Sequence, residues 1–264
     1  MNRVVRTRVV NLLLGAFRDR GKRHAILWLS LYCELSGERR HTAVAAADLE
    51  AAWAHRYPDD TTPGRALEKS TAALEGLLTC RGPDWGPRAH DTAPRPQDGA
   101  PLAVERHPDL VPFLAAACDR IRIYAKLVRQ MASQERALER WAPVRRAVAE
   151  AAMCFNAGLF FEAHELLEHH WVGLPRSPAR RYLQGIIQIS VGFHHAMRGS
   201  YHGAVNQLEK GLAKLAEASG DALGLDRDRF RRDVEAARQE MVARGQQGMR
   251  PAALEELPRM HLGR

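Results

Sequence analysis

Apolar residues in the second half of the chain recur at intervals of three and four, which is the period of amphipathic α-helices. From residue 144 onward this pattern predicts an antiparallel helical bundle, and prolines at 143, 175 and 178 separate some of its helices. The tail, residues 245–264, contains three glycines and two prolines and is expected to be flexible or to dock loosely. The predicted helices are 144–157, 159–172, 179–198, 202–218 and 226–244.

The first half of the chain also has a helical pattern, and one segment interrupts it. Residues 82–101 contain eight prolines and glycines, so they form no regular element. They are either an interdomain linker or a long loop inside one domain, and the elements on either side favour the loop. These elements are helices near 4–20, 23–36, 46–57 and 62–79, and two candidate antiparallel strands, Leu77–Arg81 and Leu102–Arg106.

Three helices followed by a β-ribbon with a long tip resemble the winged-helix fold in their order, over about residues 20–107. The resemblance implies that helix 62–79 is a recognition helix and that the loop 82–101 is the wing. Winged helices also serve as protein-docking modules, so both kinds of partner stay open. The candidate nucleic-acid contacts are Arg65, Lys69, Arg20, Lys22 and Arg23.

The charge of the chain makes an acidic partner plausible. The formal net charge is +8, and the basic residues concentrate in the first 146 positions. Residues 1–40 hold nine arginines or lysines against three acids, and residues 120–146 hold eight against two. This distribution fits a nucleic-acid surface and an ordinary solvated face equally well.

Residues 109–143 are predicted to be one long connecting helix. Its apolar residues follow a spacing close to a heptad, which suits either a helix that bridges two domains or a contact between two copies of the chain. We therefore expect a homodimer as one outcome. The residues of this stripe are Ile121, Tyr124, Val128, Met131 and Leu138.

An internal repeat organises the bundle. The pattern Gly158-x-Phe160-x-x-Ala163 returns 41 residues later as Gly199-x-Tyr201-x-x-Ala204. Within the first copy, His164 shares a helical stripe with apolar residues, so it is expected to point into the bundle. The next helix carries Gln184, Gln188 and His195 on one stripe. Burying these groups without partners costs several kcal/mol each, on the order of 2–7, so they are expected to meet one another.

At these residues the sequence resembles a known family, the domain-of-unknown-function family number 309. The resemblance covers about residues 147–218 and is carried by Phe155-Asn-Ala-Gly-x-Phe-Phe-Glu-Ala-His-Glu-x-x-Glu-x-x-Trp171 and by Leu183-Gln-Gly-Ile-Ile-Gln188. It implies a small all-helical bundle that has been labelled a predicted metal-dependent hydrolase. The first 140 residues have no counterpart in that family.

Three interpretations of this polar cluster follow. In the first, His164, Glu168 and His195 bind a divalent metal such as zinc, manganese or iron, and Glu165 is the catalytic base. In the second, the same groups form a closed hydrogen-bonded network with Gln184, Gln188 and Trp171. In the third, the cluster lines a pocket for a small ligand.

Other features of the sequence narrow the class of protein. The chain contains no phosphate-binding glycine loop and no nucleophile elbow. No apolar run is long enough for a membrane span, which predicts a cytoplasmic protein. Its four cysteines are 47, 38 and 36 residues apart and include no C-x-x-C pair, so they are predicted to be buried free thiols.

The fold expected from the sequence is mainly α. It comprises a basic winged-helix-like region (1–108), a connecting helix (109–143), an antiparallel bundle (144–244) and a flexible tail (245–264). The function that these features favour is a DNA-associated binding or regulatory protein whose bundle mediates interaction or ligand sensing. The alternatives are a metal-dependent hydrolase and an adaptor that docks a protein partner on the bundle.

Overall fold

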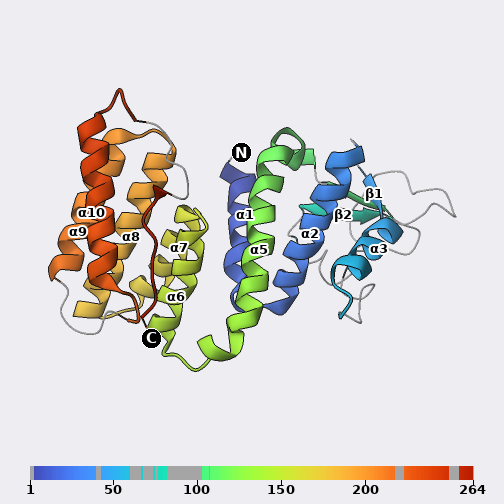
Figure 1. Cartoon of the computed structure of the whole chain (residues 1–264). Helices are drawn as coiled ribbons and strands as arrows, with labels where there is room; N and C mark the ends of the chain where they lie inside the picture. The colour runs from blue at the N-terminus through green and yellow to red at the C-terminus, as the bar shows by residue number, and fades with distance from the viewer. Residues whose placement is uncertain are drawn as a thin grey trace. The chain divides into compact units, whose positions relative to one another are not determined.

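The computed structural model describes residues 3–39, 43–59, 67, 74, 77–81, 103–106, 108–217, 223–249 and 256–263, and it is mainly α-helical (Figure 1). The chain divides into two compact units, Met1–Ala132 and Ser133–Arg264. The division falls inside α5 (Leu114–Leu138), the helix that covers most of the predicted connecting segment. None of the helices in the described residues is long and apolar enough to cross a membrane.

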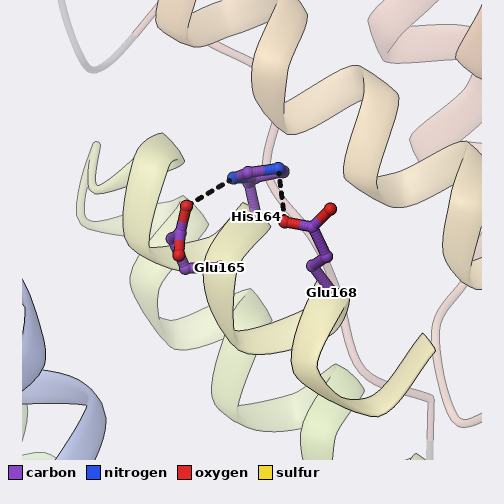
Figure 2. A group of neighbouring side chains, drawn as sticks. All are labelled: His164, Glu165 and Glu168. Atoms are coloured by element: carbon purple, nitrogen blue, oxygen red, sulfur yellow. Dashed lines mark ion pairs between the residues drawn. The ribbon is translucent and has the colours of Figure 1, made fainter. Parts of the chain in front are cut away.

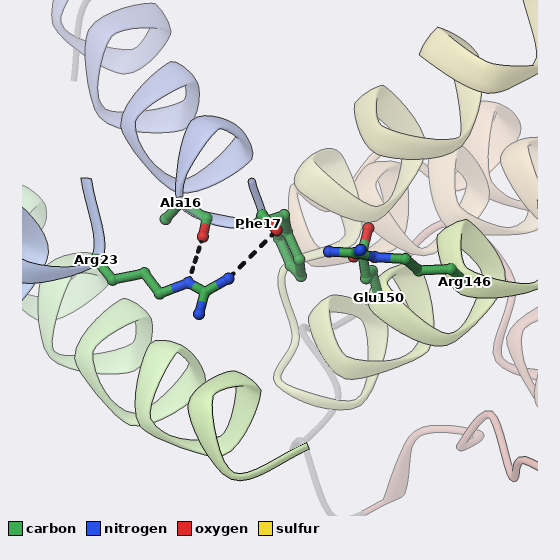
Figure 3. A network of polar contacts seen from close by, with 5 residues as sticks. All are labelled: Ala16, Phe17, Arg23, Arg146 and Glu150. Carbon is green, nitrogen blue, oxygen red and sulfur yellow. Dashed lines mark hydrogen bonds and ion pairs between the residues drawn. The ribbon is translucent and has the colours of Figure 1, made fainter. Parts of the chain in front are cut away.

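The N-terminal unit begins with two helices, α1 (Arg3–Ala16) and α2 (Arg20–Arg39), joined by a tight turn. The carboxylate of Asp19 accepts a hydrogen bond from the backbone N–H of Gly21 at 2.7 Å, which satisfies a free N–H at the start of α2. The side chain of Arg23 donates to the carbonyl oxygens of Ala16 and Phe17, at 2.7 and 3.4 Å, where α1 ends (Figure 3).

This position corrects the prediction for Arg23. It is only 7% exposed, so it is part of the α1–α2 turn and does not offer its guanidinium at the surface. Two free carbonyls at a helix end attract a cation, and that is why a charged residue is buried here. Arg20 is exposed, and the side chain of Lys22 lies over Gly15.

A three-stranded antiparallel sheet follows, in the order β1-β3-β2. Strands β2 (Leu78–Arg81) and β3 (Ala103–Arg106) pair with Cys80 opposite Val104, which confirms the predicted ribbon. Strand β1 (Ala43–Ala45) was not predicted, and it pairs with the other edge of β3. Most of the predicted recognition helix, including Arg65 and Lys69, lies outside the described residues. The loop 82–101 also lies outside them, so the winged-helix assignment stays a prediction.

Aromatic side chains are the largest ones in the core of this unit. Trp53, on α3 (Ala46–Arg56), stacks on Trp28 with ring centroids 4.1 Å apart, and the ring of Tyr57 lies tilted against Trp53 at 4.7 Å. A short 3₁₀ segment, η1 (Pro108–Phe113), leads into α5, whose predicted stripe is buried at Ile121, Tyr124 and Val128. This stripe is therefore part of the hydrophobic core.

The predicted free thiols are wrong for one pair of cysteines. Cys33 on α2 and Cys118 on α5 form a disulfide, with their Cα atoms 5.5 Å apart. Cys154 is buried and forms no disulfide, as predicted, and the side chain of Cys80 lies outside the described part of the chain. The two bonded cysteines are 85 residues apart, and no spacing rule identifies such a pair from sequence.

The C-terminal unit is the predicted bundle, and each of its helices begins and ends within one residue of the prediction. Side-chain caps explain two of the starts: Ser177 accepts from the N–H of Arg180, and Asp226 accepts from the N–H of Arg229, both at 3.2 Å. The helices are α6 (Pro143–Asn156), α7 (Phe160–Val172), α8 (Pro178–Met197), α9 (Tyr201–Glu217) and α10 (Arg227–Arg244).

Helix α8 packs closely on α9 because two glycines face each other. A Cβ atom on Gly185 would lie 3.1 Å from the carbonyl oxygen of Gly211, and a Cβ atom on Gly211 would lie 2.8 Å from the carbonyl oxygen of Gly185. Elsewhere in the core, the ring of Phe155 makes edge contacts with Phe160 and Phe230, at 4.8 and 5.4 Å between centroids.

The end of the chain is more ordered than the predicted flexible tail. In residues 256–263, Leu257 and Met260 are buried. The backbone N–H of Asp226 donates to the carbonyl of His261 at 2.8 Å, and the side chain of Asn156 bonds to the backbone of Met260. Two buried apolar side chains and paired backbone groups hold this segment on the bundle, whereas its glycine and proline content had suggested looseness.

Candidate functional site

The two copies of the internal repeat share a backbone device that sets the start of a helix. Gly158 and Gly199 both have positive φ, +74° and +70°, a conformation that favours glycine. The N–H of Gly158 donates to the carbonyl of Phe155, and the N–H of Gly199 donates to that of Ala196. Each glycine therefore ends one helix and allows the next, α7 or α9, to begin within two residues.

Helix α7 brings an imidazole between two carboxylates (Figure 2). The Nδ1 atom of His164 lies 3.5 Å from a carboxylate oxygen of Glu165, and its Nε2 atom lies 3.3 Å from a carboxylate oxygen of Glu168. The two acids thus approach opposite edges of the ring. The side chain of His164 is 18% exposed, while those of Glu165 and Glu168 are 37% and 47% exposed, so the cluster is partly open to solvent.

These three residues form the one His–carboxylate group with metal-ligand spacing among the residues that the structure describes. One ligand atom from each lies within 4.8 Å of the others. Helical spacing explains the closeness of His164 and Glu168, because residues four apart are neighbours on a helix surface. Three of the sequence-predicted site residues, His164, Glu165 and Glu168, are therefore brought together.

His195 is not part of this cluster. Its ring packs against α9, where a Cβ atom placed on Gly203 would lie 2.8 Å from the ring of His195. His195 is half-buried on α8, as its helical stripe predicted. It faces α9, however, and not α7, the helix that carries His164. The structure therefore does not place His195 as a third ligand with His164.

The predicted hydrogen-bonded network is not closed among the described residues. The Oε1 atom of Gln188 and the Nε1 atom of Trp171 are buried, and neither has a hydrogen-bond partner there. The Nδ1 atom of His164 is likewise buried and lacks a hydrogen bond of good geometry, although Glu165 is near it. Gln184 is half-buried on the same helix as Gln188.

Trp171 makes a contact that the sequence did not suggest. The guanidinium of Arg180 lies over its indole ring, 4.3 Å from the centroid. Arg180 also donates to the carbonyl of Leu174 in the loop between α7 and α8. Trp171 and Arg180 therefore help to fix that loop at the end of the helix that carries the cluster.

Sequence reasoning missed one residue beside the cluster, Phe161, and two buried carboxylates in the same bundle, Glu162 and Glu150. The ring of Phe161 lies 5.9 Å from that of His164 and 5.4 Å from that of His194, so it links α7 to α8 beside the cluster. Glu162 and Glu150 are buried carboxylates, and Glu150 pairs with Arg146 at 2.6 Å (Figure 3). Glu162 lies inside the family motif, and that was the signal that could have found it.

The separation of two atoms tests whether these residues fit a metal ion. Two ligands that are each about 2.1 Å from a tetrahedral ion lie about 3.4 Å apart. The Nε2 atom of His164 and the Oε2 atom of Glu168 are 3.3 Å apart, so they need little movement to share one ion. Glu165 lies at the other edge of the ring, where a carboxylate orients a metal-binding histidine.

These features define a helical-bundle domain with a partly buried His–carboxylate cluster on its second helix. Residues 148–207 match the family described as Domain of unknown function (DUF309), so the C-terminal unit contains a DUF309 domain. The chain is similar to the uncharacterized protein YpuF of Bacillus subtilis (strain 168), with 34% identity over 74 residues. That match covers 27% of this chain and 42% of YpuF. No solved structure matches the chain.

Proposed function

We propose that the DUF309 domain binds a divalent metal ion through the Nε2 atom of His164 and the carboxylate of Glu168. The observation that carries this proposal is the 3.3 Å separation of these two atoms on a partly exposed face of α7. An imidazole with a carboxylate suits zinc, manganese or iron. Because only two protein ligands face each other, water or substrate would complete the coordination.

The chemistry that this site supports is hydrolysis. A divalent ion held here would lower the pKa of a bound water and supply a nucleophile near neutral pH. His164 and Glu168 would hold the ion, and the solvent-exposed carboxylate side of the cluster would face the substrate. We therefore propose a metal-dependent hydrolase as the activity of this domain.

Glu165 has a different role in this proposal from the base that the sequence suggested. Its carboxylate lies at Nδ1, on the opposite edge of the ring from Glu168. A proton on Nδ1, held toward Glu165, leaves the lone pair of Nε2 free for the ion. Glu165 is thus a positioning residue. We expect Glu165→Ala to weaken metal binding by about 10–100-fold and Glu165→Gln, which still accepts a hydrogen bond, to restore part of the loss.

Metal titration tests the proposal directly. The full chain is stripped with a chelator and titrated with Zn²⁺, Mn²⁺ and Fe²⁺ by calorimetry. We expect one site per chain, lost in His164→Ala and in Glu168→Gln. His202→Ala, which removes an exposed histidine on α9, is the matched control and should bind normally. Unchanged binding in His164→Ala would overturn the proposal.

Turnover is a separate measurement. Chromogenic esters and phosphodiesters are offered to the metal-loaded chain, and His164→Ala should abolish any hydrolysis. If the chain binds metal through His164 and Glu168 but hydrolyses none of them, the metal site stands and the hydrolase does not.

A second function, association with duplex DNA, is supported by the N-terminal unit. The elements of this unit include α2, β1, α3, β2 and β3 in that order along the chain. In the sheet, β3 pairs with both other strands. Residues 82–102 join β2 to β3, where a winged helix has its wing. We infer a DNA-associated protein with a metal-binding domain. Binding of a labelled duplex at low salt tests this function, and no binding there would overturn it.

A further inference from the structure

Helix α5 has two faces of opposite character. Ile121, Tyr124 and Val128 are at most 2% exposed and lie in the core. Arg122, Lys126 and Arg129 are exposed and follow one another at steps of four and three, so they share the opposite face. At 1.5 Å per residue, their Cα atoms span about 10 Å along the helix axis. We call these three residues the α5 basic face.

Most of the positive charge on this face is not neutralised within the described chain. Arg122 pairs with Asp119 at 2.8 Å, and both side chains are exposed, so solvent weakens that pair. The Nε atom of Arg129 donates to the carbonyl of Ala125 on its own helix. Neither Lys126 nor Arg129 has an ion pair with an acid among the described residues.

The end of α3 lies within electrostatic range of Arg129. Arg56, the last residue of α3, and Arg129 both act electrostatically on the hydroxyl of Tyr57 and oppose the rise of its pKa that burial causes. Arg56 pairs with Glu34 at 3.0 Å, which leaves Arg129 as the cation beside Tyr57 that has no acidic partner among the described residues.

We propose that the α5 basic face binds the phosphate backbone of duplex DNA. This inference rests on the DNA association proposed above and names a surface for it. A duplex carries one negative charge per about 1.7 Å of axis, so about six phosphates accompany the 10 Å of this face. Arginine suits phosphate oxygens because its planar N–H groups donate in pairs.

Two other partners fit this face less well. Ile123, 38% exposed, is the largest apolar side chain on this side of α5, and a helix that lies on a membrane needs a broad apolar face. An acidic protein would normally bind through an apolar centre with a charged rim, and the three cations surround no apolar centre here. The even row of cations instead matches a regular polyanion.

Salt-dependent binding tests the proposal with the full chain. The basic-face variant is Arg122→Gln, Lys126→Gln, Arg129→Gln. Its matched control, Lys210→Gln, Arg231→Gln, Arg232→Gln, removes three exposed cations from α9 and α10. Fluorescence anisotropy with a labelled duplex is measured between about 50 and 200 mM salt. Log affinity falls linearly with log salt concentration, and we expect the magnitude of this slope to be smaller by about 2–3 in the basic-face variant. The control should keep the wild-type slope.

Three outcomes would overturn the proposal, and they are distinguishable. An unchanged slope in the basic-face variant, with wild-type binding intact, removes the α5 surface but leaves DNA association standing. An absence of wild-type binding at low salt removes both. If the wild-type chain binds polyglutamate or phosphatidylserine vesicles as tightly as the duplex, and the basic-face variant loses that binding too, the face belongs to another anion. Circular dichroism checks that the triple variant is folded. If it is not, the single variants Lys126→Gln and Arg129→Gln replace it, and each should lower the magnitude of the salt slope by about one.

Discussion

The side chain of Asn156 pairs with the backbone of Met260 through two hydrogen bonds, one in each direction. Its Nδ2 atom donates to the carbonyl of Met260 at 2.9 Å, and its Oδ1 atom accepts from the N–H of Met260 at 2.8 Å. The amide thereby imitates a backbone pair in a sheet. It joins the last residue of α6 to a segment 104 residues later in the chain.

Replacing this amide should loosen the end of the chain. We expect Asn156→Ala to lower the free energy of unfolding by about 1–3 kcal/mol, because two partly buried backbone groups lose their partner. Hydrogen exchange at Met260 should accelerate as well. Asn206→Ala, on an exposed position of α9, should change stability by less than about 0.5 kcal/mol. Equal effects in urea unfolding would contradict the role given to Asn156.

Two glycine substitutions should act in opposite directions. A Cβ atom on Gly211 would lie 2.8 Å from the backbone oxygen of Gly185, so Gly211→Ala must push α8 from α9 and should cost about 1–3 kcal/mol. Gly37, within α2, has nothing within 4 Å of its Cβ position, so Gly37→Ala should stabilise by about 0.5–1 kcal/mol. Chemical denaturation measures both, and a stabilising Gly211→Ala would refute the close contact.

The Cys33–Cys118 disulfide should stabilise the N-terminal unit by restricting its unfolded chain. A cross-link between residues 85 apart corresponds to about 4–5 kcal/mol in the chain-entropy model. We expect a reductant, or the double change Cys33→Ser and Cys118→Ser, to lower the melting temperature markedly. Cys154→Ser removes a buried thiol that takes no part in the cross-link and serves as the comparison. If reduction left the melting temperature unchanged, the disulfide would not be stabilising.

The phenol of Tyr57 gives a prediction for alkaline pH. Burial raises its pKa above the ordinary value of 10.0 in the folded protein, against the opposing effect of Arg129 and Arg56. The folded state therefore keeps this proton to a higher pH than the unfolded state. The stabilising contribution is complete below pH 10 and is lost as the pH rises through the folded pKa. Tyr57→Phe should show a smaller loss of stability from pH 9 to 11, measured by urea unfolding at each pH. An identical loss would contradict the raised pKa.

The fold of the bundle could be predicted from sequence because its signals are local. The apolar period and the prolines lie within or beside the helix that they define, and so do the caps that the structure shows at Ser177 and Asp226. Strand β1 was missed because three residues, Ala43–Ala45, are too few to show an alternating pattern. The disulfide was missed because its partners meet only in the folded chain.

The part of the candidate site that lies on one helix was also predictable from sequence. His164, Glu165 and Glu168 lie on one helix, so their spacing alone brings them together. The neighbour of His195 depends on how two helices pack, and a helical wheel gives a direction but not the residue that lies there. Arg23 was taken as a surface cation because it stands in a run of charged residues, and only the turn at Ala16 and Phe17 shows why it is buried.

The contact between Gly185 and Gly211 also limits how the DUF309 domain can respond to a ligand. Between these two glycines no Cβ atom separates the backbones of α8 and α9, so at that point the pair has no side chain that could compress or repack. Helix α7 carries His164 and begins after the left-handed turn at Gly158. At this point the α8–α9 pair cannot close further, whereas the start of α7 depends on the backbone conformation of one glycine, Gly158.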